Sequence, residues 1–128
     1  MNLRLLQSQV KRWAAVNFGG VHGSGYRPLL GALKELGELA HAHLKEEQGI
    51  RSNEDHHADK IDAVGDIVIY LADYCEGQGI SLADAVATTW KQVQQLDWRS
   101  DPISGGKTEG AQPKTKCLPR RPDSRGNP

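Results

Sequence analysis

The chain has few of the features that mark several common classes of protein. Its 2 cysteines, Cys75 and Cys117, have neither the spacing of a metal-binding pair nor the number that a disulfide framework requires. Lysine plus arginine and aspartate plus glutamate each total 16, so the charge balance gives no reason to expect a nucleic acid or an anionic membrane as the partner. No apolar run approaches the roughly 20 residues that cross a bilayer, and the amphipathic opening segment does not resemble a signal peptide. We therefore expect a cytoplasmic protein that binds neither membranes nor nucleic acids.

What the chain does contain is enough apolar sequence for one modest core. Hydrophobic residues make up 38% of the 128 residues, which suits a single small domain. Residues 101–128 differ from the rest, because they are rich in proline and glycine and lack apolar periodicity. We expect one folded domain over residues 1–100 and a disordered tail over residues 101–128.

Apolar residues recur at helical spacing in four segments, and the chain shows little sign of strand. The expected helices cover about residues 3–17, 28–48, 54–76 and 82–96. Pro28 suits the first turn of the second helix, and Gly49 can end that helix in a left-handed conformation. Ser81 and Asp84 resemble a capping box at the start of the fourth. The chain is therefore predicted to be all-α and similar to a four-helix bundle.

Two of these helices carry closely spaced acidic residues. Glu35 and Glu38 lie three apart on the second helix, and Asp62 and Asp66 lie four apart on the third. Residues at these spacings are neighbours on a helix surface, so two packed helices can bring four carboxylates to one point. Such a cluster is unfavourable unless a cation offsets the repulsion, and oxygen ligands suit Mg²⁺ or Mn²⁺. The spacing predicts a metal site, although exposed helix faces carry similar acids.

The positions of these acids around each helix are compatible both with a cleft and with solvent. The second helix has a broad leucine row, and Glu35 and Glu38 fall largely on its opposite side. Charge composition favours a cleft for the acids of the third helix, because residues 54–78 contain seven acidic residues and only one lysine, Lys60. Solvated faces usually mix the two signs of charge. We therefore expect the acids to face a partner helix or a ligand.

Three motifs in order resemble a known family. They are Glu35-Leu-Gly-Glu38, then Asp62-Ala-Val-Gly-Asp66-Ile-Val-Ile-Tyr-Leu, then Gly79-Ile-Ser-Leu-Ala-Asp-Ala-Val. Over roughly residues 26–99 the chain resembles the MazG-like all-α nucleoside triphosphate pyrophosphohydrolases. The resemblance implies a MazG-type fold that pairs into a homodimer or homotetramer. It also implies Mg²⁺-dependent hydrolysis of a ribo- or deoxynucleoside triphosphate to the monophosphate and pyrophosphate.

One position departs from the family pattern. The family has a glutamate three residues before the aspartate that matches Asp66, and this chain has Ala63 there. Asp62 can supply a carboxylate, but it has a shorter reach and is rotated by about 100° around the helix. A site with fewer protein ligands remains compatible with Mg²⁺, which keeps several waters and binds substrate phosphates. The same loss is also how a catalytic fold could become a non-catalytic nucleotide- or protein-binding bundle, which is the alternative function.

Within the resemblance, the acids and several other residues receive roles. We expect Glu35, Glu38 and Asp66 to bind the metal, with Asp62 as a further ligand or as an acceptor for a metal-bound water. Glu35 or Glu38 would orient the attacking water as general base, and the sequence does not decide between them. The basic residues expected to meet the phosphates are Lys34, Lys45, Lys91 and Arg99.

Aromatic residues flank a glycine-rich loop between the first two helices, which lacks the P-loop pattern. Trp13, Phe18 and Tyr26 could form a slot for the base by stacking, although the phase of Trp13 also fits the core. The five histidines raise the alternative of an HD-type metal phosphohydrolase, which needs a histidine followed directly by an aspartate. This chain has the order Asp55-His56-His57 instead. That enzyme class is therefore the weaker expectation.

Overall fold

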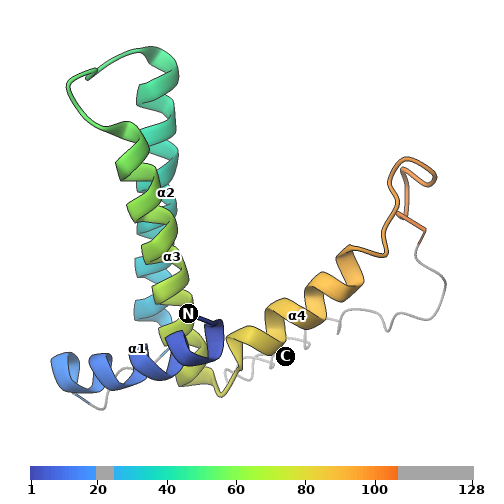
Figure 1. Ribbon diagram of the computed structural model, residues 1–128, viewed down its shortest axis with the longest axis horizontal. Coiled ribbons are helices and arrows are strands. Elements are labelled where there is room, and N and C mark those ends of the chain that lie inside the picture. The colour runs from blue at the N-terminus through green and yellow to red at the C-terminus, as the bar shows by residue number, and fades with distance from the viewer. Residues whose placement is uncertain (20–24, 107–128) are drawn as a thin grey trace, which may run out of the picture. The chain divides into compact units, whose positions relative to one another are not determined.

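The computed structural model describes residues 1–19 and 25–106, and every regular element within these ranges is helical. The helices are α1 (Leu3–Phe18), α2 (Tyr26–Gln48), α3 (His56–Gln78) and α4 (Leu82–Val93) (Figure 1). The all-α prediction is confirmed, and the predicted helix ends lie within a few residues of the observed ones. None of the helices in the described ranges has the length and apolarity needed to span a membrane. The chain divides into two compact units, residues 1–90 and 91–128.

The helices end where local chemistry satisfies their free backbone groups. The Asn2 side chain accepts a hydrogen bond from the Leu5 amide at 2.8 Å, and the Asp55 side chain accepts one from Ala58 at 3.0 Å. Gly49 closes α2 and Gly79 closes α3 in the left-handed conformation, at φ 66° and 65°. The stop at Gly49 was predicted from the sequence and is confirmed, and α3 ends at Gln78, two residues after its predicted end.

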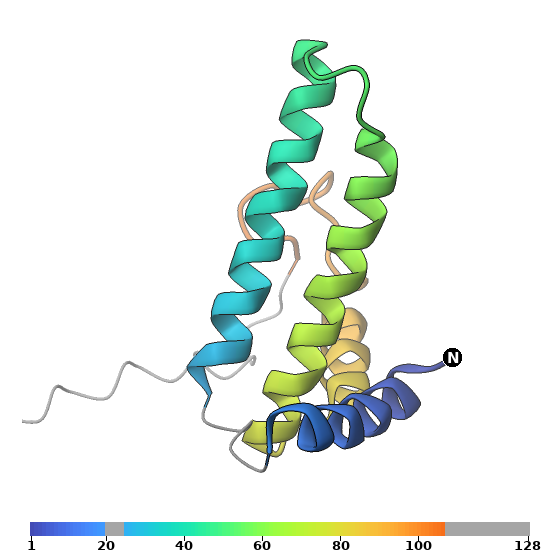
Figure 2. The same cartoon turned by 90° about the vertical axis from the view of Figure 1, so that its left-hand side faces the viewer.

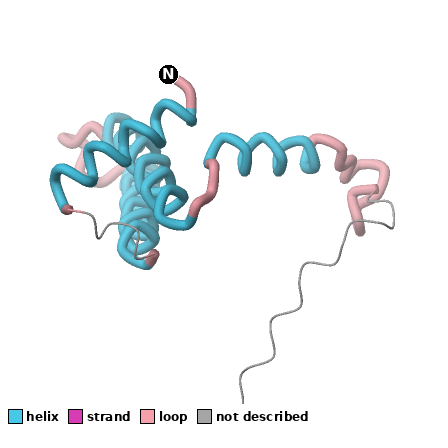
Figure 3. Tube along the Cα trace, turned by 90° about the horizontal axis from the view of Figure 1, so that it is seen from below, coloured by secondary structure: helices cyan, strands magenta, loops and turns pink. Residues whose placement is uncertain are grey.

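Within residues 1–90, α2 and α3 form an antiparallel hairpin (Figures 1 and 2). Gly31 fixes the approach of the two helices, because a Cβ at this position would lie 2.3 Å from a ring carbon of Tyr70. The far end of the hairpin is joined by an ion pair between Lys45 and Glu54 at 2.6 Å. The end of α3 nearest Gln78 packs against α1, which crosses it (Figure 3). Helix α3 therefore touches both other helices.

The hydrophobic core lies at the α1–α3 contact and is small. Its buried residues are Val10, Ala72, Cys75 and Leu82. Cys75 was predicted to be a core residue, which is confirmed, and burial raises the pKa of its thiol. Cys117 lies outside the described residues. Leu82, at the start of α4, is the buried residue of that helix.

The leucine row of α2 is exposed. Its exposed fractions run from 43% at Leu29 to 63% at Leu33. The hairpin instead buries the opposite side of α2 at Pro28, Glu35 and Ala42. Small residues let two helix backbones approach closely, and the bulky leucines face away from α3. Glu35 therefore lies on the packed side of the helix, and Glu38 is exposed beside it.

The second unit contains an ordered turn over residues 97–106, where part of a disordered tail was expected. The Asp97 amide donates to the Gly105 carbonyl at 3.0 Å, and Asp101 accepts from the amides of Ile103 and Ser104, both at 3.0 Å. The hydroxyl of Ser104 and these amides lower the pKa of Asp101 to about 2. The expectation of disorder is wrong for residues 101–106, and residues 107–128 lie outside the described part of the chain.

Candidate metal and nucleotide site

Helices α2 and α3 bring one acid of each predicted pair into the same pocket. Glu38 and Asp62 line a cavity of about 200 Å³ between the two helices. The other residues that line it are His41, Ala42, Lys45 and Asp59. The pocket therefore collects three carboxylates, an imidazole and an ammonium group, and we call it the carboxylate pocket. Asp59 and His41 were not predicted as site residues, although each lies three positions from a predicted acid on the same helix.

Glu35 is buried at the same interface and is paired with a lysine. Its side chain lies 2.9 Å from the Lys34 ammonium, which also lies 3.0 Å from the carboxylate of Glu38. These contacts raise the pKa of Lys34 well above its ordinary value. Hydrogen bonds from Lys34, and secondarily with Glu35, lower the pKa of Glu38. The charge of Lys34 thus offsets the repulsion between Glu35 and Glu38, which a metal ion was expected to offset.

Ala63 occupies a position that points into the packed interface. It is 3% exposed on the side of α3 that faces α2. A glutamate here would extend its carboxylate between the helices, near the acids of α2. Asp62, one residue earlier, instead lines the carboxylate pocket. The chain therefore keeps a carboxylate beside Glu38 but lacks one at the buried position.

Asp66 lies in a different cavity from Glu38 and Asp62. It lines a groove of about 480 Å³ between α1 and α3. The groove is walled by Leu6, Gln9, Val10, Trp13, Ala14 and Phe18 of α1 and by Asp66, Ile69, Tyr70 and Asp73 of α3. The four predicted acids therefore do not meet at one point. Glu35 is buried, Glu38 and Asp62 line the carboxylate pocket, and Asp66 lines the aromatic groove.

The aromatic groove contains two of the three residues expected to hold a base. The rings of Trp13 and Phe18 meet edge to face, with centroids 5.5 Å apart and an angle of 81° between the planes. Trp13 is 57% exposed, so it belongs to the groove wall and not to the core. Tyr26 is also exposed and does not line the groove, whereas Tyr70 of α3 does. The packed face of α1 is the apolar face that also carries Trp13, and Val10 and Ala14 are its buried residues.

The cations predicted to meet phosphate have different surroundings. Lys45 lines the carboxylate pocket, and its side chain is 11% exposed. Lys91 and Arg99 belong to residues 91–128, where Arg99 pairs with Asp97 at 3.2 Å. Lys34 is held by its two glutamates, and Lys45 pairs with Glu54 at 2.6 Å. Lys45 is therefore the basic residue that the structure brings into the pocket with the acids.

The carboxylate pocket has the donor chemistry that a hard divalent cation prefers, but Glu38, Asp59 and Asp62 do not form a group whose ligand atoms all lie within 4.8 Å of one another. Glu38, Asp59 and Asp62 offer oxygen atoms, and Mg²⁺ is bound in many proteins through one or two carboxylates together with water and substrate phosphates. The chain does not match any protein-family model, curated protein or solved structure with which it was compared. Membership of the MazG-like family therefore stays a prediction from the three motifs.

Proposed function

We propose that the protein is a Mg²⁺-dependent hydrolase that cleaves a ribo- or deoxynucleoside triphosphate to the monophosphate and pyrophosphate. The observation that carries the proposal is the convergence of Glu38 with Asp62 and Asp59 in one pocket that also contains Lys45. The aromatic groove between α1 and α3 supports it, because a nucleotide needs an apolar slot as well as a site for its phosphates.

In this proposal Glu38 and Asp62 hold the cation. A bound Mg²⁺ would screen the triphosphate, polarise a phosphoryl oxygen and lower the pKa of an attacking water. Glu38 is suited to be a ligand because the ammonium of Lys34 keeps the carboxylate ionised to lower pH than usual. A carboxylate with a lowered pKa is a weaker proton acceptor. We therefore assign Glu38 to cation binding and leave the general base to another carboxylate of the pocket.

Lys45 and the aromatic residues bind the rest of the nucleotide. The charge of Lys45 favours phosphate at the carboxylate pocket, because the three acids alone would repel it. Trp13, Phe18 and Tyr70 offer ring faces and edges to a base in the aromatic groove. Asp66 and Asp73 line the same groove and can accept hydrogen bonds from amino groups of a base. Binding by stacking together with polar contacts would orient the substrate towards the acids.

The test is release of pyrophosphate from a panel of ribo- and deoxynucleoside triphosphates, with Mg²⁺, with Mn²⁺ and with a chelator. We expect metal-dependent release of pyrophosphate and monophosphate. Glu38→Gln should lower the rate by about 100-fold or more, because it removes a ligand charge at nearly constant volume. Glu47→Gln is the matched control on the exposed side of α2 and should keep the rate. Release of orthophosphate, or full activity in Glu38→Gln, would contradict the proposal.

A non-catalytic nucleotide-binding bundle is the second candidate. Two observations favour it. Position 63 is buried and holds an alanine in place of an acid, and Glu35 and Glu38 are both ion-paired with Lys34. If the wild-type protein releases no product from any substrate but binds nucleotides in equilibrium dialysis, this second function replaces the first.

We also propose that the protein forms a homodimer or homotetramer through α2. The exposed side of α2 carries Leu29, Leu30, Leu33, Leu36 and Leu44, each more than 40% exposed. Monomeric proteins rarely leave such a continuous apolar face in water. A second copy of the same helix would cover it with a self-complementary surface. The acids lie on the other side of α2, so this contact would leave the carboxylate pocket open.

A further inference from the structure

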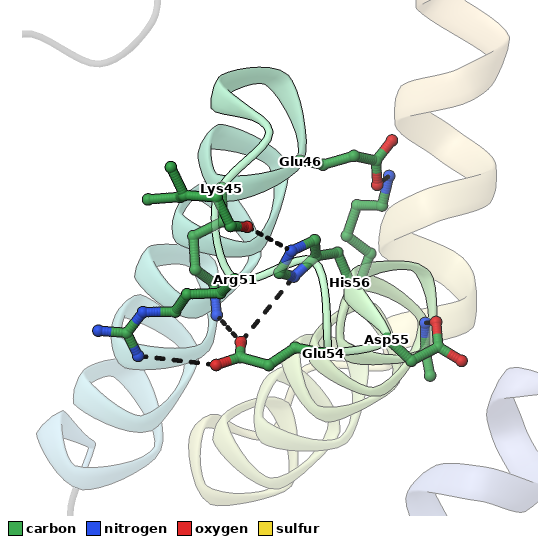
Figure 4. Close-up of polar contacts among 9 residues, drawn as sticks. Lys45, Glu46, Arg51, Glu54, Asp55 and His56 are labelled. Carbon is green, nitrogen blue, oxygen red and sulfur yellow. Dashed lines mark hydrogen bonds and ion pairs between the residues drawn. The ribbon is translucent and has the colours of Figure 1, made fainter.

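The end of the hairpin where α2 joins α3 contains a polar cluster around His56 (Figure 4). The His56 side chain is 10% exposed, and its Nε2 lies 3.1 Å from the Ile50 carbonyl oxygen. A carbonyl can only accept, so Nε2 carries the hydrogen and donates it. In a neutral ring this leaves Nδ1 with a lone pair. Nδ1 is buried and has no hydrogen-bond partner among the described residues.

The lone pair of Nδ1 faces carboxylates and not a donor. Glu54 has a carboxylate oxygen 3.9 Å from Nδ1. Asp59, one turn further along α3, completes a group in which one ligand atom from each residue lies within 4.8 Å of the others. A buried acceptor opposite two further acceptors is unfavourable unless a proton on Nδ1 or a metal cation lies between them.

We propose that Glu54, His56 and Asp59 bind one transition-metal dication of the Zn²⁺ type. Zn²⁺ takes one imidazole nitrogen and carboxylate oxygens at about 2.0–2.2 Å, which places tetrahedral ligands about 3.4 Å apart. Rotation of Glu54 and of the exposed Asp59 closes the larger separations to this value. The Nε2 hydrogen bond to Ile50 is the outer contact that fixes a metal-bound histidine in one tautomer.

The surrounding charges are compatible with such an ion. Lys45 donates to Glu54 at 2.6 Å and Arg51 lies 3.6 Å from the other oxygen of the same carboxylate. A carboxylate has about four lone-pair positions, and the two basic residues leave others for a metal. The two carboxylate ligands carry two negative charges, and a dication would compete with Lys45 and Arg51 for the charge of Glu54.

An ion at this position would act as a staple for the hairpin end. The apolar core lies at the opposite end, by α1, and the loop between α2 and α3 is held by ion pairs and by the His56–Ile50 hydrogen bond. Three protein ligands leave a fourth position for water. The site shares Asp59 with the carboxylate pocket, and its His56 nitrogen favours Zn²⁺ over the Mg²⁺ that we assign to Glu38 and Asp62. It does not depend on the proposed hydrolysis.

The test is calorimetric titration of the full chain with Zn²⁺, together with Co²⁺ binding followed by visible absorption. A Cys117→Ser background removes the thiol outside the described residues. We expect one tight equivalent of Zn²⁺, with a tetrahedral Co²⁺ spectrum, unaffected by millimolar Mg²⁺. His56→Ala and Glu54→Gln should each weaken binding by at least about 10-fold. His57→Ala, which changes the adjacent exposed histidine, should bind as the parent does.

Circular dichroism of each variant shows whether it is folded, and Glu54→Gln tests the site even if His56→Ala does not fold. Unchanged Zn²⁺ binding in Glu54→Gln or in folded His56→Ala, or no stoichiometric binding by the parent, would overturn the proposal. Glu38→Gln should keep the Zn²⁺ equivalent, so loss of turnover in that variant and loss of Zn²⁺ binding in the His56 variant are separate results.

Discussion

The contact between Gly31 and Tyr70 gives a sharp test of how the hairpin packs. A Cβ built on Gly31 would lie 2.3, 2.5 and 2.6 Å from three carbons of the Tyr70 ring. Ordinary van der Waals contact begins at 3.4 Å, so the ring would have to retreat by about 1 Å, the difference between 3.4 and 2.3 Å. Gly31→Ala therefore forces either the ring or the helix out of place.

Two opposing effects set the size of the change. Replacing glycine by alanine inside a helix contributes about 1 kcal/mol to stability through helix propensity. Overpacking at a close contact costs about 1–3 kcal/mol, and this contact is at the severe end. We expect Gly31→Ala to lower the free energy of unfolding by about 1–2 kcal/mol. For a domain of this size that lowers Tm by about 4–16 °C.

The assay is thermal and urea unfolding followed by circular dichroism at 222 nm. Gly37→Ala is the matched control on the same helix, because a Cβ there meets nothing within 4 Å. It should raise stability by about 0.5–1 kcal/mol. Gly31→Ala combined with Tyr70→Ala should lose less stability than the sum of the two single changes, since the added methyl group then has space.

The result that would refute this packing is simple to recognise. If Gly31→Ala is as stable as the parent or gains stability as Gly37→Ala does, Tyr70 does not lie over Gly31 in solution. If the double variant shows no coupling between the positions, the loss of stability has another origin.

Two further predictions concern α2. Lys34→Met should raise the pKa of Glu38 towards its ordinary value in a carboxyl ¹³C NMR titration. In the parent, the lowered pKa of Glu38 stabilises the fold at pH values above the pKa of the unfolded state. This stabilisation is lost as the pH falls through the pKa of the folded state. Unchanged titration of Glu38 would show that the ion pair does not form in solution. Leu33→Glu, at the most exposed leucine of the row, should shift sedimentation from dimer or tetramer to monomer while leaving the helical content unchanged, and an unchanged mass would exclude this face as the interface.

Local signals in the sequence predicted the helices and their ends well. Glycines at positions 49 and 79 are each followed by a break in apolar periodicity, and both are left-handed stops in the structure. Backbone conformation at such positions depends on the residue itself, because only glycine takes up a positive φ without strain. The burial of Cys75 was also predicted, since it continues the apolar side of α3.

Which side of α2 packs on α3 was not predictable from hydrophobicity. The leucine row is the most apolar side of the helix, but the hairpin buries the side with Gly31, Glu35 and Ala42. Close approach of backbones favours small residues, and the buried Glu35 is accommodated because Lys34 pairs with it. A repeat of small residues on both helices, completed by Ala63 on α3, was the available signal.

The candidate site was predicted only in part for a related reason. Spacing within a helix placed Glu38 and Asp62 on usable faces, and the two do share a pocket. The register between the helices decides which acids meet, and it depends on contacts such as that between Gly31 and Tyr70, which sequence spacing does not encode. Asp66 is therefore in the aromatic groove with α1 and not beside Glu38.

The position of α3 between its two neighbours has a consequence for the order of folding. Contacts between α2 and α3 are local in the chain, so the hairpin can form early and quickly. Helix α1 reaches α3 only after a loop containing all of α2 is closed, and it is held by a small core around Val10 and Cys75. One wall of the aromatic groove is thus added in the last folding step. From this order we expect release of α1 to open the groove before the hairpin unfolds.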